Sequence, residues 1–307
     1  MDFSRVWDGE GVRWHAFCIH DYNVDMLNSE ILEAALPDGR FGRPLVFYES
    51  IGSTNEVALQ WARRGAPHGA LVVADEQTAG RGRKGRRWLT PRGSALAMSL
   101  ILRPSGVLSR GLSSLTALGA LAIVDAVERE GVPCEIKWPN DVLIRGRKAA
   151  GVLVEAAWED GQLTHAVVGI GVNVAPASVP PNPEVDFPAT CVAWGAGREV
   201  ERVRLLCEIA CSLERWYSRL GTAELLAAWE ARLAYRGEAV IVSEGEREVV
   251  GRMLGLSQEG RLRVRTTDGG DVEFVDGEVS LRPVDMAGES DTLGAPFGGS
   301  EVGNDVR

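Results

Sequence analysis

The chain has 307 residues, which is long enough for one or two domains with a substantial buried core. Hydrophobic residues make up 45% and charged residues 25%, as in ordinary globular proteins, and no apolar run is long enough to span a bilayer, so a membrane segment is not expected. The net charge of -10 opposes binding to nucleic acid or to an anionic membrane surface.

Residues 1–44 are mixed in character and acidic, and we treat them as an N-terminal extension whose role the sequence does not reveal. Within it, residues 27–36 have the spacing of a helix. A DNA-reading helix-turn-helix module needs more length and a basic face, so DNA binding is not expected. The N-terminus lacks the pattern of a secretory signal, and the five cysteines form no C-x-x-C pair. We therefore expect a cytoplasmic protein with small buried thiols.

Residues 45–235 predict an α+β domain. Ser53-Thr54-Asn55-Glu56 matches a capping box, with Ser53 at the N-cap of a helix that runs to about Arg64. Several later strands follow one another without an intervening helix, which indicates hairpins and hence a mixed, mainly antiparallel sheet. The expected strands are 45–48, 70–74, 94–102, 134–138, 142–145, 151–158 and 164–172, with further helices at 112–130 and 202–234.

The C-terminal part of the chain has a different pattern. Residues 236–284 read as short strands split by turns such as Asp268-Gly269-Gly270, which is typical of a small β-barrel. Residues 285–307 are rich in Gly, Ser, Asp and Glu and predict a disordered tail.

A cationic segment lies between two of the apolar strands. Gly80 to Trp88 holds five cations and three glycines, and no acidic residue occurs from Gln77 to Arg103. Glycines permit close backbone approach and arginines offer forked donors to phosphate oxygens, so the segment predicts a confined anionic ligand. A disordered RNA-binding tail has a similar composition, but such a tail is not normally framed by core strands.

The chain contains only three lysines, Lys84, Lys137 and Lys148, among 33 basic residues. A compact ammonium where arginine is the usual cation indicates a specific role, although codon bias is the alternative. In Lys137-Trp138-Pro139-Asn140-Asp141 the lysine can bind phosphate and Asp141 can hold Mg²⁺. The alternative is a β-turn with a surface ion pair. We assign no specific role to Lys84, because an arginine should serve equally well at that position.

Two further strands carry possible ligand contacts. Lys148 stands at the start of the buried strand 151–155, where it can point inward as a hydrogen-bond donor. Two glycines in the strand 169–173 predict a ligand lying against the backbone. Neither a dinucleotide fingerprint nor a GxxxxGK[ST] phosphate loop is present, so ATP would need another cradle.

Together these segments resemble the biotin–protein ligases. The match comprises Ser53-Thr54-Asn55 and the runs 77–86, 137–141, 148–155 and 169–173, in the family's order and spacing. The resemblance implies a catalytic domain related to class II aminoacyl-tRNA synthetases, followed by an SH3-like domain at 236–284. It also implies the monofunctional type, without a DNA-binding repressor domain.

The family reaction has two steps. The biotin carboxylate attacks the α-phosphate of Mg-ATP to give biotinyl-5′-adenylate and pyrophosphate, and a lysine of a biotin carboxyl carrier domain then takes the acyl group. Such steps depend on positioning and charge neutralisation. By resemblance the chain acts on biotin and ATP with Mg²⁺, as a monomer or homodimer.

The resemblance also implies roles for individual residues. Lys148 donates to the biotin carboxylate, Arg83 closes over the adenylate, and Trp88 either stacks on adenine or only packs. The implied biotin site is Ser53, Thr54, Asn55, Gln77, Gly80, Arg81, Lys148 and Gly151. The implied ATP and phosphate site is Arg83, Arg86, Trp88, Lys137, Asn140 and Asn173. The implied catalytic group is Lys148, Arg83, Lys137 and Asp141, with Asp141 as the magnesium ligand.

Rival readings are a lipoate–protein ligase and a nucleic-acid-binding regulator. The glycine-rich segment of the lipoate enzymes is absent here, and net acidity opposes nucleic-acid binding. A catalytically inactive binding protein is the third alternative, although no matched position is lost.

Overall fold

The computed structural model describes residues 26–103, 112–160, 162–181, 187–275 and 279–283. The predicted tail at 285–307 and residues 1–25 of the N-terminal extension lie outside the described residues. None of the helices in the described part of the chain is both long and apolar enough to cross a membrane.

The first sheet has seven strands in the order β1-β2-β3-β7-β6-β5-β4. Strands β1 and β2 run parallel, and every other neighbouring pair is antiparallel. The mixed, mainly antiparallel sheet predicted for this region is therefore confirmed. Its strands are β1 (Leu45–Tyr48), β2 (Leu71–Ala74), β3 (Ala95–Leu102), β4 (Glu135–Lys137), β5 (Asp141–Ile144), β6 (Arg147–Glu159) and β7 (Gln162–Asn173).

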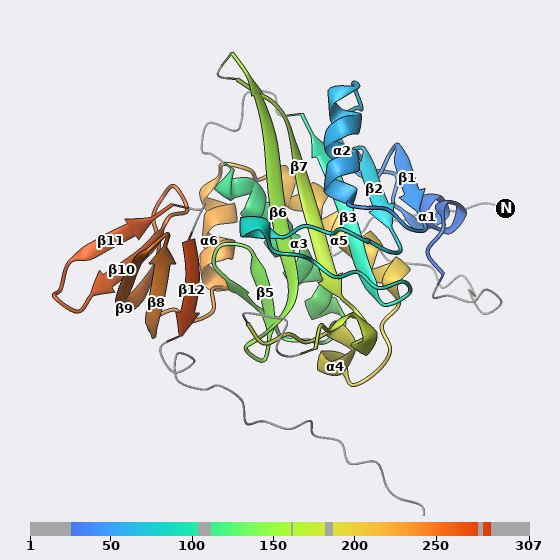
Figure 1. Cartoon of the computed structure of the whole chain (residues 1–307). Coiled ribbons are helices and arrows are strands. Elements are labelled where there is room, and N and C mark those ends of the chain that lie inside the picture. The colour runs from blue at the N-terminus through green and yellow to red at the C-terminus, as the bar shows by residue number, and fades with distance from the viewer. Residues whose placement is uncertain (1–25, 104–111, 161, 182–186, 276–278, 284–307) are drawn as a thin grey trace, which may run out of the picture.

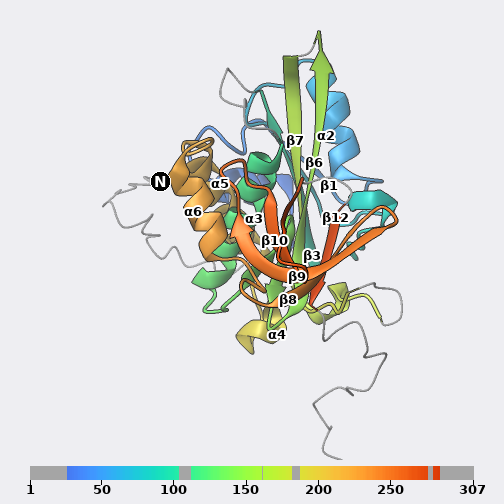
Figure 2. The same ribbon diagram turned by 90° about the vertical axis from the view of Figure 1, so that its left-hand side faces the viewer.

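Helices cover both faces of this sheet. Figure 2 shows α2 on one side of β6 and β7, and α3 and α5 on the other. Strand β3 serves both faces by alternation, because Ile101 packs with α2 while Leu100 and Leu102 enter the main core. The described helices are α1 (Ser29–Ala35), α2 (Thr54–Arg63), α3 (Ser113–Arg129), α4 (Val192–Ala196), α5 (Arg202–Tyr217) and α6 (Ala223–Ala231).

The described part of the N-terminal extension packs onto the first sheet's core. Helix α1 lies within the stretch 27–36, where the sequence predicts a helix. It is capped by Asn28, whose side chain accepts a hydrogen bond from Ile31 N at 2.8 Å. Leu32 and Leu36 are buried in the main core, and Phe41 contacts the ring of Tyr217. The boundary expected at residue 44 therefore does not separate two cores.

The C-terminal strands form a second, five-stranded antiparallel sheet in the order β11-β10-β9-β8-β12 (Figure 1). Its inner face is apolar, with Val242, Met253 and Phe274 buried and continuous with the main core. The strands are β8 (Ala239–Glu244), β9 (Arg247–Leu256), β10 (Leu262–Thr266), β11 (Asp271–Phe274) and β12 (Val279–Pro283).

Candidate active site

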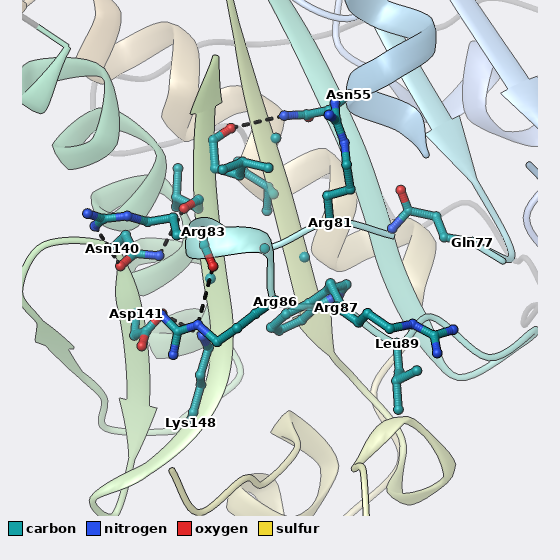
Figure 3. A pocket seen from close by; sticks show the side chains of 18 of the residues that line it. Asn55, Gln77, Arg81, Arg83, Arg86, Arg87, Leu89, Asn140, Asp141 and Lys148 are labelled. Carbon is teal, nitrogen blue, oxygen red and sulfur yellow. Dashed lines mark hydrogen bonds and ion pairs between the residues drawn. The ribbon is translucent and has the colours of Figure 1, made fainter. Parts of the chain in front are cut away.

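A cavity of about 520 Å³ lies between the cationic segment 80–88 and the middle of strands β6 and β7. This volume is in the range of pockets that enclose small organic ligands. Figure 3 shows Arg86 next to Asp141 of β5 and Lys148 of β6, and Arg83 next to Asn140. Among the described residues, its lining carries five cationic side chains and one carboxylate. Such a wall favours an anionic ligand.

The cationic segment is an ordered hairpin. Trp88 N donates to Gly80 O at 2.9 Å, and Gly82 N donates to Arg86 O at 2.7 Å. A 3-10 turn (Arg83–Gly85) forms its tip. The disordered-tail alternative is therefore wrong for this segment. Gly80 does not line the cavity, and a Cβ there would clash with the Trp88 carbonyl, so the hairpin's own closure requires this glycine.

The N-terminus of α2 forms one end of the cavity. Thr54 donates to Gln77 Oε1 from its backbone N at 2.8 Å and from its hydroxyl at 3.1 Å. Gln77 Nε2 in turn donates to Thr90 Oγ1 at 3.1 Å, which fixes the amide orientation. Ser53 is the N-cap residue, as predicted, but its hydroxyl makes no capping bond. The capping box is thus not formed, and Ser53 is one of the residues that line the cavity.

Asn55 lines the same end but has its polar atoms committed to the protein. Its Nδ2 donates to Glu155 Oε2 at 2.9 Å, and its Oδ1 accepts from Ser99 Oγ at 2.6 Å. Arg81 also pairs with Glu155 Oε2 at 2.9 Å. The pair is partly exposed and contributes roughly 0–1 kcal/mol, so it positions the hairpin more than it stabilises the fold.

The two glycines of β7 are covered by the protein's own side chains. A Cβ on Gly169 would clash with the Asn55 amide, and one on Gly171 would clash with the Trp88 indole. The prediction that these glycines admit a ligand against the backbone was therefore incomplete, because Asn55 and Trp88 already lie there. The Trp88 Nε1 atom is buried without a hydrogen-bond partner.

Lys137, Asp141 and Lys148 form a buried charge cluster. Lys148 Nζ lies 2.6 Å from Asp141 Oδ1, and Lys137 Nζ lies 3.4 Å from Oδ2. Burial by itself would raise the pKa of Asp141, but Lys148 and then Lys137 outweigh it and hold that pKa below its usual value. Burial lowers the pKa of Lys137, and Asp141 opposes that shift. The surface ion pair considered for this turn is therefore wrong.

The two lysines of the cluster face different surroundings. Lys148 lines the cavity and stands 5.5 Å from the centre of the Trp88 ring. Lys137 lies behind Asp141, 4.2 Å from the centre of the Phe187 ring, and does not line the cavity. Lys148 therefore has access to a bound ligand, whereas Lys137 contacts Asp141 and not the cavity.

Two amides complete the wall. Asn140 Oδ1 accepts from Arg83 Nη1 at 3.1 Å, so the hairpin tip is tied to the 137–141 turn. Asn173 Nδ2 donates to Thr190 O at 3.0 Å, which leaves the side-chain oxygen for a ligand.

Most of the residues expected at the site come together there. Gly80 and Lys137 are the two that do not line the cavity. Those that do are Ser53, Thr54, Asn55, Gln77, Arg81, Arg83, Arg86, Trp88, Asn140, Asp141, Lys148, Gly151 and Asn173.

Sequence reasoning missed several neighbours. Phe187 follows a proline-rich stretch that carries no motif, but it lines the cavity and contacts Lys137. Glu155 belonged to a quoted segment but had no assigned role. Arg87 was passed over in favour of Arg86, although both line the cavity.

A protein-held metal does not fit this cluster. Within the described residues no group of three or more His, Cys, Asp or Glu is placed to hold an ion. Both carboxylate oxygens of Asp141 face lysine ammonium groups, which compete with any cation. Cys134, Cys191 and Cys207 are buried, and burial raises the pKa of the Cys207 thiol to about 12, as expected for core residues.

The part of the chain that forms the first sheet matches a known family of ligases. The model for the Biotin/lipoate A/B protein ligase family matches residues 47–173, the span that holds β1 to β7. The chain belongs to this family.

Among the individual relatives and solved structures that the chain resembles, several are named as biotin ligases. The chain is 36% identical over 238 residues to the bifunctional ligase/repressor BirA of Bacillus subtilis, covering 74% of this chain and 71% of that protein. It is 38% identical over 226 residues to the biotin--[acetyl-CoA-carboxylase] ligase of Paracoccus denitrificans, covering 69% and 90%. The biotin protein ligase of Aquifex aeolicus, solved with biotin and ATP, superposes with a TM-score of 0.67 at 30% identity, covering 78% of this chain and 99% of that one.

Proposed function

We propose that this chain is an ATP-dependent biotin–protein ligase, which activates biotin as biotinyl-5′-adenylate and transfers it to one lysine of a biotin carboxyl carrier domain. The observation that carries the proposal is the position of Lys148. Its ammonium lies inside a cavity ringed by arginines and is held by a buried carboxylate 2.6 Å away.

The α2 end of the cavity suits the uncharged ring of biotin. Ser53 and Thr54 line this end, and Gln77 is fixed by its bonds to Thr54 and Thr90. Fixed donors and acceptors of this kind read a urea-like group without reorganising. Asn55 is a poor direct contact because its amide is engaged with Ser99 and Glu155. We assign it to shaping the wall.

The opposite end suits a nucleotide. Arg83 and Arg86 line it, and Asn140 holds Arg83 in place. Arginine forks match phosphate oxygens, so these side chains neutralise the charge that builds up as the carboxylate attacks the α-phosphate. The free acceptor of Asn173 is our candidate contact for the adenine amino group.

Lys148 serves both half-reactions. As a donor to the biotin carboxylate it aligns the attacking oxygen, and as a donor to the acyl oxygen of the adenylate it polarises the carbonyl toward the incoming amine. Asp141 holds this ammonium in position, while Lys137 balances the second oxygen of Asp141. The acceptor lysine brings the nucleophile, so no Ser-His-Asp arrangement is required.

Magnesium enters our proposal with the phosphates of ATP. When bound there it would neutralise phosphate charge. Asp141 was expected to be its ligand, but the carboxylate is paired with two lysines, so we assign Asp141 to positioning Lys148.

Our proposal extends to architecture and setting. The mainly antiparallel first sheet supports a class II synthetase-like catalytic domain, and the five strands after residue 236 support an SH3-like second domain. We expect a monomer or homodimer in the cytoplasm that binds neither DNA nor membrane.

Exchange of labelled pyrophosphate into ATP tests the first half-reaction, because it needs no acceptor protein. We expect exchange with biotin and none with lipoate. The second half-reaction is tested with a carrier domain and its Lys→Arg variant at the acceptor, and only the former should be labelled. Exchange that lipoate supports and biotin does not would refute the proposal.

A further inference from the structure

The second sheet touches the active-site turn through one buried hydrogen bond. Trp138 Nε1 donates to Gly260 O, in the turn between β9 and β10, at 3.3 Å. Trp138 is 1% exposed, so this N–H has no access to water. An indole N–H left unpaired in such a place is costly, which gives the carbonyl of Gly260 control over the indole orientation.

The turn itself is rigid. Gly260 N donates to Ser257 O at 3.0 Å, and Ser257 N donates to Arg261 O at 2.9 Å. Ser113 Oγ donates to Glu259 O at 3.4 Å and ties the turn to the start of α3. The position of the Gly260 carbonyl is therefore set by contacts on both sides.

Only glycine fits at position 260. Its φ of +77° lies in the left-handed region, and a Cβ there would stand 2.9 Å from Trp229 Cζ3 of α6. Trp229 is 1% exposed, and a small cavity of about 20 Å³ borders both it and Gly260. A side chain at position 260 would have to displace either the turn or the Trp229 ring.

A second link joins the same two regions. Ile136 N donates to Arg232 O at 2.7 Å, and Ala234 N donates to Ile136 O at 2.9 Å. The segment that leads from α6 into β8 thus pairs with β4, directly before Trp138. The 137–141 turn is therefore anchored twice: just before it, where Ile136 pairs with the segment that follows α6, and at Trp138, by the turn between β9 and β10.

The cavity side of this turn carries the chemistry. Asn140 holds Arg83, and Asp141 holds Lys148 at 2.6 Å. Both residues follow Trp138 by no more than three positions, so a shift of the indole moves the groups that orient the reactive cations. Small displacements matter here, because a misplacement of about 1 Å can cost roughly a hundredfold in rate.

We infer that Gly260 is a positioning residue: its carbonyl, acting through Trp138, sets the 137–141 turn, so that the second sheet determines how Arg83 and Lys148 meet the substrate. The test of this inference by kcat rests on the proposed ligase function. The test by hydrogen–deuterium exchange of the 137–141 turn does not.

The test compares Gly260→Ala with Gly269→Ala. Gly269 lies in another turn of the same sheet with a φ of +90°, and a Cβ there meets nothing within 4 Å, so backbone strain is matched while the push on Trp229 is not. Trp138→Phe is the second variant, because it removes the N–H donor and keeps an aromatic ring. Each protein is assayed for pyrophosphate exchange, biotin affinity by calorimetry, and hydrogen–deuterium exchange of the peptide 137–141.

We expect Gly260→Ala and Trp138→Phe each to lower the exchange kcat by about tenfold to a hundredfold. The Kd for biotin should stay within about twofold, and peptide 137–141 should exchange faster. Gly269→Ala should match the wild type in all three. The double variant Gly260→Ala/Trp138→Phe should have a kcat little lower than that of either single variant, since both substitutions disrupt the same contact.

An unchanged kcat in both variants, with only a lower Tm, would overturn the inference. So would a loss in Gly269→Ala equal to that in Gly260→Ala, which would point to general strain in the sheet. If the wild type shows no biotin-dependent exchange, the proposed function fails, and deuterium uptake at 137–141 then decides the coupling by itself. Unchanged uptake in Gly260→Ala and Trp138→Phe would refute it.

Discussion

The indole of Trp88 rests against the bare backbone of Gly171 in the centre of the candidate active site. Trp88 ends the cationic hairpin, and Gly171 lies on β7, which is the opposite wall of the cavity. The contact therefore sets how closely the hairpin approaches the sheet.

Substitution of Gly171 by alanine should open this contact. A Cβ at that position would clash with the indole, so Trp88 must move and the cavity must change shape. We expect the Kd for biotin to rise by about tenfold while the fold is retained, as a misfitted pocket loses roughly 1.4 kcal/mol. Calorimetry and circular dichroism measure the two quantities. Gly52→Ala is the control, because a Cβ there meets nothing within 4 Å. Equal affinities for both variants would contradict the finding.

Lys148 should be essential to adenylate formation. Lys148→Met keeps the length of the side chain but removes the ammonium held by Asp141. We expect pyrophosphate exchange to fall by about 10²–10³, the usual effect of losing a donor at a developing charge. Lys84→Arg is the control and should keep full activity, since Lys84 does not line the cavity. A Lys148→Met enzyme within tenfold of the wild type would exclude the assigned role.

Removal of the Asp141 carboxylate should destabilise the fold. Asp141→Asn leaves Lys137, which is 7% exposed, without its counter-charge. Breaking such a buried pair costs about 3–5 kcal/mol in the free energy of unfolding. Urea unfolding at neutral pH measures it, with Asp268→Asn on the surface as the control.

The destabilisation caused by Asp141→Asn should depend on pH. The pKa of Asp141 is lowered from 3.8 in the folded protein, so its stabilising contribution is fully present above that value and is lost as the pH falls through the folded pKa. The difference in unfolding free energy between wild type and Asp141→Asn should therefore be constant above about pH 5 and shrink in stronger acid. A difference that grows toward low pH would have the wrong sign.

Arg83 should retain the reactive intermediate. Its guanidinium ties the hairpin tip to Asn140, and a mixed anhydride hydrolyses or reacts elsewhere once the cavity is open. We expect Arg83→Gly to release adenylate and to label lysines of bystander proteins, detected by avidin blotting of a mixture with serum albumin. Arg92→Gly, which removes an exposed pair with Glu49, should label only the carrier domain. Full target selectivity in Arg83→Gly would exclude a closing role for the hairpin.

The sequence predicted the strands of the first sheet to within a few residues, and a run of short strands after residue 236, because periodicity and turn residues report local preferences directly. The Ser53 cap shows the limit of local signals. Its position was right, but the hydroxyl makes no capping bond, and Ser53 lines the cavity, which no four-residue pattern reveals.

By itself the sequence determined the order of elements and the cationic segment between two strands, and its family resemblance named most of the residues that converge on one cavity. Only the tertiary structure decided that Lys148 faces the cavity while Lys137 lies behind Asp141, that Trp88 covers Gly171, and that the turn at Gly260 holds Trp138. The physical reason is that the pattern of apolar and polar residues along the chain indicates only which side chains are buried. Which of two buried neighbours a group meets depends on packing between segments far apart in the chain.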